Sequence, residues 1–133
     1  MAFRCSTYFV IQGEMSKQEI TEKLGVEPTG SWVKNSKKAY GKRTLKDTYW
    51  AYGTEKMEYE RVFDMEEQCE YILLELKDKV EILKRIKREN NVAFSLVLIP
   101  EISNKKRPII GWPLEITKFC SEIGASIEIA YQV

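Results

Sequence analysis

Two stretches of the chain carry apolar residues on both faces of a strand, and they constrain the fold more than any other feature. Residues 3–12, FRCSTYFVIQ, and residues 91–100, NVAFSLVLIP, are rich in β-branched and aromatic residues, which favour strands. In the first stretch Phe9 and Ile11 point to one side and Val10 to the other. A strand of this kind is covered on both faces, so both segments are predicted to be central strands.

A short helix is predicted directly after the first of these strands. In MSKQEITEKLG, residues 15–25, Ser16 and Glu19 form a capping box, in which each side chain satisfies a free backbone N–H of the first turn. Gly25 suits the left-handed position that ends a helix, and Pro28 prevents the helix from continuing.

A longer amphipathic pattern covers residues 65–89. Asp64 and Glu67 form a capping pair at its start, and Asp78 and Glu81 form a second one within it. The second pair leaves open whether the segment is one helix or two. Apolar positions at helical spacing are predicted to face the core: Cys69, Ile72, Leu73, Leu76, Val80, Leu83 and Ile86.

The chain closes with a third helix and a last strand. Pro113 suits the first position of a helix, and Gly124 suits its C-terminal cap. Between them runs an apolar stripe of Ile116, Phe119, Cys120 and Ile123. Residues 126–133, SIEIAYQV, alternate in polarity and predict a strand whose core face holds Ile127, Ile129, Tyr131 and Val133.

Three more strands are predicted in the middle of the chain, at residues 31–34, 48–55 and 57–63, with a loop at 35–47. The last of them is an exposed edge that could pair between chains. The order β-α-β-β-β-α-β-α-β favours a single α+β domain over residues 1–133. We expect one mixed, largely antiparallel sheet with helices packed on it, as in an elaborated ferredoxin-like fold.

The composition excludes several classes of function. The net charge is +1, so only a local patch could attract nucleic acid or an anionic membrane. The chain has no histidine, which removes the ordinary Ser–His and Cys–His catalytic sets and the commonest metal ligand. No run approaches the ~20 apolar residues of a membrane helix. We therefore expect a non-enzymatic protein without cofactor, metal site or membrane segment.

The three cysteines, Cys5, Cys69 and Cys120, lie far apart in the sequence. Their odd number and wide spacing argue against a disulfide framework and against a cysteine-rich zinc site. Cys69 and Cys120 fall on apolar helix stripes, so we expect both to be small buried hydrophobic residues. Because the N-terminal residues do not form a signal peptide, we expect a reduced, cytoplasmic compartment.

Acidic side chains gather between residues 55 and 70. Glu58 and Glu60 share one strand face, as a carboxylate enzyme or a magnesium site would require. A solvated strand followed by acids that favour a helix N-terminus explains the same pattern, so no catalytic residue is assigned. The cluster comprises Glu55, Glu58, Glu60, Asp64, Glu66, Glu67 and Glu70.

The segment 32–52 combines basic and aromatic residues. Its loop 34–46 carries six cations without an acid between them, and aromatic rings flank and interrupt the loop. Tryptophan, tyrosine and arginine anchor protein interfaces, whereas rings with cations also suit single-stranded nucleic acid. A solvated loop with Trp32 and Trp50 in the core is the third alternative. The candidate partner-binding residues are Trp32, Lys34, Lys37, Lys38, Tyr40, Arg43, Trp50 and Tyr52.

The exit from the first helix resembles one known family. The sequence fits the pattern I-x-x-x-L-G-[IV]-x-P-[TS], followed by a tryptophan and then a tryptophan-containing strand, through Ile20, Leu24, Gly25, Val26, Pro28, Thr29, Trp32 and Trp50. This order resembles the bacterial family called domain of unknown function 4279, over nearly the whole chain. The resemblance implies a small intracellular α+β domain, and it implies no assigned activity and no catalytic residues.

These observations lead to one expected function and two alternatives. We expect a monomer or homodimer that binds another protein, as an immunity-type or regulatory partner, by analogy with other small bacterial domains. The first alternative is a nucleic-acid-binding module that uses loop 34–46 with Trp32, Tyr40 and Trp50. The second is a carboxylate-based enzyme or small-ligand sensor.

Overall fold

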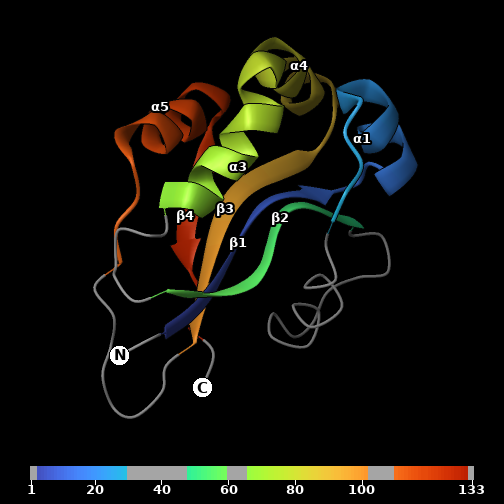
Figure 1. The fold of residues 1–133 in the computed structure, drawn as a ribbon. Helices are drawn as coiled ribbons and strands as arrows, with labels where there is room; N and C mark the ends of the chain where they lie inside the picture. Colours follow the sequence, from blue (N-terminus) through green and yellow to red (C-terminus); the bar gives the residue numbers. More distant parts are fainter. Residues whose placement is uncertain (1–2, 30–47, 60–65, 102–109, 132–133) are drawn as a thin grey trace.

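The computed structural model describes residues 3–29, 48–59, 66–101 and 110–131 of the chain, and it forms one sheet with helices packed on it (Figure 1). The elements follow in the order β1 (Phe3–Gly13), α1 (Lys17–Leu24), β2 (Thr48–Tyr59), α3 (Glu66–Leu76), η2 (Lys77–Lys79), α4 (Val80–Glu89), β3 (Val92–Glu101), α5 (Leu114–Ile123) and β4 (Ala125–Ile129). Within these ranges no helix combines the length and the apolar character needed to span a membrane.

The sheet has the strand order β2-β1-β3-β4. β1 pairs antiparallel with both β2 and β3, whereas β4 pairs parallel with β3. The prediction that residues 3–12 and 91–100 form central strands is therefore confirmed, and so is the mixed α+β class. The parallel strands β3 and β4 are direct neighbours joined through α5, whereas a split βαβ unit would place another strand between them.

The helices α1, α3, α4 and α5 share one face of the sheet and enclose the main core there (Figure 1). Phe9 of β1 lies at its centre, with ring centroids 5.7 Å from Phe94 of β3 and 5.9 Å from Phe119 of α5. The opposite face of the sheet carries a second, smaller buried cluster made by Tyr8, Val10, Tyr49, Ala51, Val97 and Ile99. Both faces of β1 are thus buried, as its sequence predicts.

The two strands predicted at 48–55 and 57–63 are one strand as far as Tyr59, and residues 60–63 lie outside the described ranges. Cys5 pairs with Met57 and Thr7 pairs with Thr54, so two steps of β1 face three steps of β2. Such an extra residue is a β-bulge, which bends a strand without ending it. The predicted break at residue 56 falls at this bulge, because a bulge interrupts the alternation of polarity as a turn does.

A buried amide joins α3 to β1 at this irregularity. Gln68 is completely buried. Its Nε2 donates to the backbone carbonyl of Cys5 at 2.8 Å, and its Oε1 accepts from the Thr7 hydroxyl at 2.6 Å. One side chain thus pairs with two polar groups of β1 in the protein interior, so Gln68 holds α3 in place over the bulge.

The segment 65–89 forms two helices, α3 and α4, joined by the short 3₁₀ turn η2. The cap of α4 is Lys79, without a side-chain hydrogen bond, so Asp78 does not act as the predicted N-cap. The predicted cap Asp64 lies outside the described residues. In α1, by contrast, the Ser16 hydroxyl accepts from the Glu19 N–H at 3.1 Å, and Gly25 takes the left-handed conformation with φ 68°.

The C-terminal elements agree with the sequence in part. Pro113 is the N-cap of α5 rather than its first residue, and Gly124 caps the end of the helix as predicted. β4 ends at Ile129 and pairs only with β3 among the described strands. Ile127 packs against the core, but the side chains of Ile129 and Tyr131 are 39% and 48% exposed, because a short edge strand is covered over only part of its length.

Replacing Gln68 by Leu is expected to lower the free energy of unfolding by about 1–3 kcal/mol, because the Cys5 carbonyl and the Thr7 hydroxyl lose their partner while buried. Urea unfolding followed by circular dichroism measures the change. Gln18→Leu on the exposed face of α1 is the matched control, with an expected change within about 0.5 kcal/mol. Equal effects of the two substitutions would show that the buried amide has no special role.

Candidate functional site

The predicted aromatic and basic patch falls largely outside the described residues. Trp32, Lys34, Lys37, Lys38, Tyr40 and Arg43 all belong to the range 30–47, for which no placement is given, and so does the predicted strand at 31–34. Partner binding through these residues, whether to protein or to nucleic acid, stays a prediction. Trp50 and Tyr52 are described, and both belong to β2.

Trp50 is a core residue. Its side chain is completely buried, and it lies opposite Ile11 of the neighbouring strand β1. The indole Nε1 donates to the Thr21 hydroxyl of α1 at 3.0 Å, which satisfies the one polar group of the ring. The indole therefore connects β2 to α1. For Trp50 this agrees with the third alternative given by the sequence, a core tryptophan, and the buried ring offers no surface to a partner in this structure.

Tyr52 is covered by another aromatic residue. Its side chain is 7% exposed, and its ring stacks on Tyr71 of α3 with centroids 5.4 Å apart and planes 2° from parallel. Burial raises the pKa of the Tyr52 phenol, and its hydrogen bond with Tyr71 and the charge of Glu75 raise it further. Tyr71, which is 43% exposed, is thus the ring of this pair that faces solvent.

All three cysteines are buried and free, and they belong to the same core cluster. Burial raises the pKa of Cys5 and of Cys69 to about 12 and that of Cys120 to about 11. Cys120 and Cys5 contribute to the shift at Cys69, so the fold brings thiols together that the sequence keeps far apart. The prediction of buried, hydrophobic roles for Cys69 and Cys120 is confirmed, and the thiols stay protonated near neutral pH.

The acidic cluster at 55–70 is described only in its second part. Glu66, Glu67 and Glu70 are exposed on the first turns of α3, where negative charge favours the helix N-terminus. The side chains of Glu58 and Glu60, on which a carboxylate site would depend, lie outside the described residues. Among the residues that the structure describes, no group of Cys, Asp and Glu side chains is arranged to hold a metal ion.

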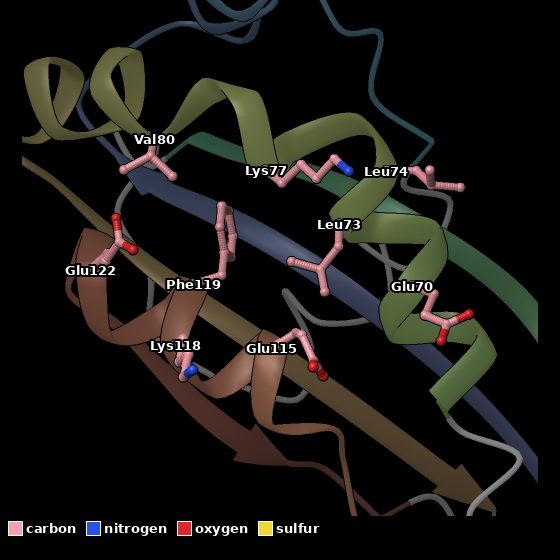
Figure 2. A pocket seen from close by; sticks show the side chains of 9 residues that line it. All are labelled: Glu70, Leu73, Leu74, Lys77, Val80, Glu115, Lys118, Phe119 and Glu122. Carbon is pink, nitrogen blue, oxygen red and sulfur yellow. The ribbon is translucent and has the colours of Figure 1, made fainter.

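A groove of about 500 Å³ lies between α3 and α5 (Figure 2). Its floor is apolar. Leu73 of α3 and Phe119 of α5 lie between the two helices, and Val80 at the start of α4 closes one end (Figure 2). Phe119 and Leu73 also pack into the main core, so the floor of the groove is the outer side of that core.

The rim of the groove is charged. α3 and η2 contribute Glu70 and Lys77, and α5 contributes Glu115, Lys118 and Glu122, all of them exposed. Leu74 belongs to the same lining, yet its side chain is 70% exposed. An apolar centre with a charged rim is the usual anatomy of a surface that binds another protein.

Two leucines that fall outside the predicted apolar stripes are the sequence signal for exposed apolar surface near this groove. The stripe predicted for residues 65–89 leaves out Leu74, and the stripe of the last helix leaves out Leu114, which is 62% exposed. A leucine outside the buried stripe of a helix is apolar surface without a core role. Only the packing of α3 beside α5 shows that Leu74 borders a groove.

The comparison with family models identifies the kind of protein. The model described as Domain of unknown function (DUF4279) matches residues 3–133. The chain belongs to this family. No curated protein and no solved structure matches it.

In this DUF4279 domain, the helix exit that resembles the family pattern has a structural role. Leu24 and Val26 are buried in the main core. Thr29 N–H donates to the Ala51 carbonyl at 2.8 Å, and the Thr29 hydroxyl accepts from Gly53 N–H at 2.8 Å and donates to the Gly53 carbonyl at 2.9 Å. The segment after α1 is thereby fastened to the outer edge of β2.

Gly53 stands where the backbone of β1 comes close to β2. A Cβ atom at this position would overlap the Thr7 carbonyl oxygen and the Tyr8 Cα atom, both of them backbone. The hydrogen bonds to Thr29 hold the other side of Gly53 in place. The residue must therefore lack a side chain, for packing rather than for catalysis.

Replacing Gly53 by Ala is expected to lower the free energy of unfolding by more than about 2 kcal/mol, because backbone must move to admit the methyl group. Gly111→Ala is the matched control, since a Cβ there would meet no atom within 4 Å. Its expected effect is within about 0.5 kcal/mol. Thermal unfolding of both variants decides the matter, and a well-tolerated Gly53→Ala would contradict the close approach.

The buried thiols are expected to resist modification in the folded protein. With Ellman's reagent at pH 8, the native domain should release little thionitrobenzoate within minutes, because the thiols are covered and their pKa values lie at about 11 to 12. After denaturation in guanidinium, all three cysteines should react. A fast-reacting thiol in the native protein would show that one of them is accessible and ionised.

Proposed function

We propose that this DUF4279 domain acts by binding another protein in the cytoplasm, as an immunity-type or regulatory partner, rather than by catalysing a reaction. The observation that carries the proposal is the groove between α3 and α5, with its apolar floor, its charged rim and the exposed Leu74. An exposed apolar patch with a polar rim is a feature that marks sites of protein–protein interaction.

The side chains that line the groove support binding more than chemistry. Its ionisable groups are all exposed carboxylates and amines at the rim, and none is buried next to a partner that would tune it. The three cysteines, whose pKa values are raised, lie in the core, where their neutral thiols are poor nucleophiles. The pKa of the Tyr52 phenol is raised too, and this residue does not line the groove. The chain also has no histidine to act as a general base.

Photo-crosslinking in the cells that make the protein tests this proposal. A benzophenone amino acid is placed at position 74 on the α3 wall or at position 115 on the α5 wall, and in a matched control at Gln18 on the exposed face of α1. We expect one and the same protein to be crosslinked from both walls and not from position 18. No adduct from either wall, or the same adducts from all three positions, would refute the proposal.

A further inference from the structure

We infer that the groove receives an amphipathic helix of the partner, with Lys or Arg at the end that meets Glu70 and Glu115 and acidic residues near its middle. The inference rests on the proposed protein-binding function, and it specifies the chemistry of the bound segment. Its basis is the spacing of the lining residues, the place of their polar groups, and the distribution of charge along the rim.

The spacing of the lining residues suits a third helix. From α3 and η2 the groove is lined at positions 70, 73, 74 and 77, and from α5 at positions 115, 118, 119 and 122. Both sets follow i, i+3, i+4, i+7, so each wall is a single helix face. The ridges of such faces define the grooves into which another helix packs, and helix-in-groove binding uses anchors at the same spacing.

The length of the walls sets the size of the bound segment. The lining runs from position 70 to 77 on one wall and from 115 to 122 on the other, so at about 1.5 Å per residue each wall is roughly 10 Å long. About eight residues of a helix, or two turns, would fill this length. An apolar stripe of that size has room for three or four anchors over Leu73, Phe119 and Val80.

The place of the polar groups favours a helix over a small molecule. Small-molecule sites of comparable volume contain a few polar groups within the cavity that fix the orientation of the ligand. Here the polar lining side chains are exposed at the rim, and the floor offers only hydrocarbon. A groove with an apolar floor and a charged rim is complementary to an apolar helix stripe that is flanked by charged residues.

The charges are ordered along the groove. Glu70 and Glu115 come from the N-terminal halves of the two walls and lie at the same end, away from Val80 (Figure 2). Lys77 and Lys118 stand farther along the two walls, and Glu122 lies beyond Lys118 toward Val80 (Figure 2). The ion pairs between described residues that the structure contains are Lys84–Glu81 and Arg85–Glu89, both on α4, so in this part of the chain no cation neutralises the acidic end.

The proposal is tested with two 12-residue peptides, each held helical by a hydrocarbon staple because so short a helix is marginal in water. Both carry leucines at i, i+3, i+4 and i+7, and they differ only in having two lysines or two glutamates in one terminal turn. Fluorescence anisotropy at low salt measures their affinity for the full chain. We expect the lysine peptide to bind about five-fold more tightly than the glutamate peptide.

Charge reversal separates the groove from the rest of the surface. In the double variant Glu70→Lys, Glu115→Lys the preference is expected to reverse, because the acidic end becomes basic. The control variant Glu22→Lys, Glu128→Lys changes the net charge equally at exposed sites that do not line the groove, and it should keep the wild-type preference. At 0.5 M salt the two peptides should bind alike, since exposed charges are then screened.

Two results would overturn the inference. One is that neither peptide binds the folded protein at 1 mM, and the other is that both double variants show the same peptide preference. Failure of the peptides with intact crosslinks from positions 74 and 115 refutes the helical, cationic segment alone. Peptide binding without any crosslink in cells refutes the protein-binding function and leaves the chemistry of the groove standing.

Discussion

The burial of β1 on both faces is the constraint on which the rest of the structure depends. β1 pairs with β2 on one side and with β3 on the other, and its register with β3 runs without interruption from Arg4–Glu101 to Gly13–Val92. One face places Phe9 and Ile11 under the helices, while the other buries Tyr8 and Val10. Each such apolar side chain stabilises the fold by about 1.5–3 kcal/mol when fully buried, so neither face of the strand can be left in water.

The packing of the helices follows from this arrangement. The residues of α3 and α5 that face the sheet, such as Ile72 and Ile116, pack in the main core together with Phe9. Gln68 then secures α3 over the β-bulge, and Thr29 secures the exit of α1 on Gly53. The side chains of α3 and α5 that point toward each other and away from the sheet line the groove. The candidate site therefore results from the packing of two helices side by side on one sheet.

Much of the fold could be predicted because its determinants are local. The N-cap at Ser16, the left-handed Gly25 and the two-sided apolar strands depend on residues close together in the chain. The predicted break at residue 56 was wrong for the same reason: a bulge and a turn look alike locally, and only the pairing of Thr7 with Thr54 and Cys5 with Met57 tells them apart. The edge position of Ile129 likewise depends on which strands surround β4.

The candidate site could not be predicted from residues that are close together in the chain. By itself the sequence determined the α+β class, the central strands, both caps of α1, the C-terminal cap of α5 and the membership of the family. Only the tertiary structure decided that Trp50 is buried, that Tyr71 covers Tyr52, that the thiols gather in one core, and that Leu74 borders a groove. The physical reason is that these features arise between segments far apart in the chain, as Gln68 and Thr7 are by 61 positions. Because the hydrophobic effect is not directional, an apolar pattern shows which face is buried but not which distant segment covers it.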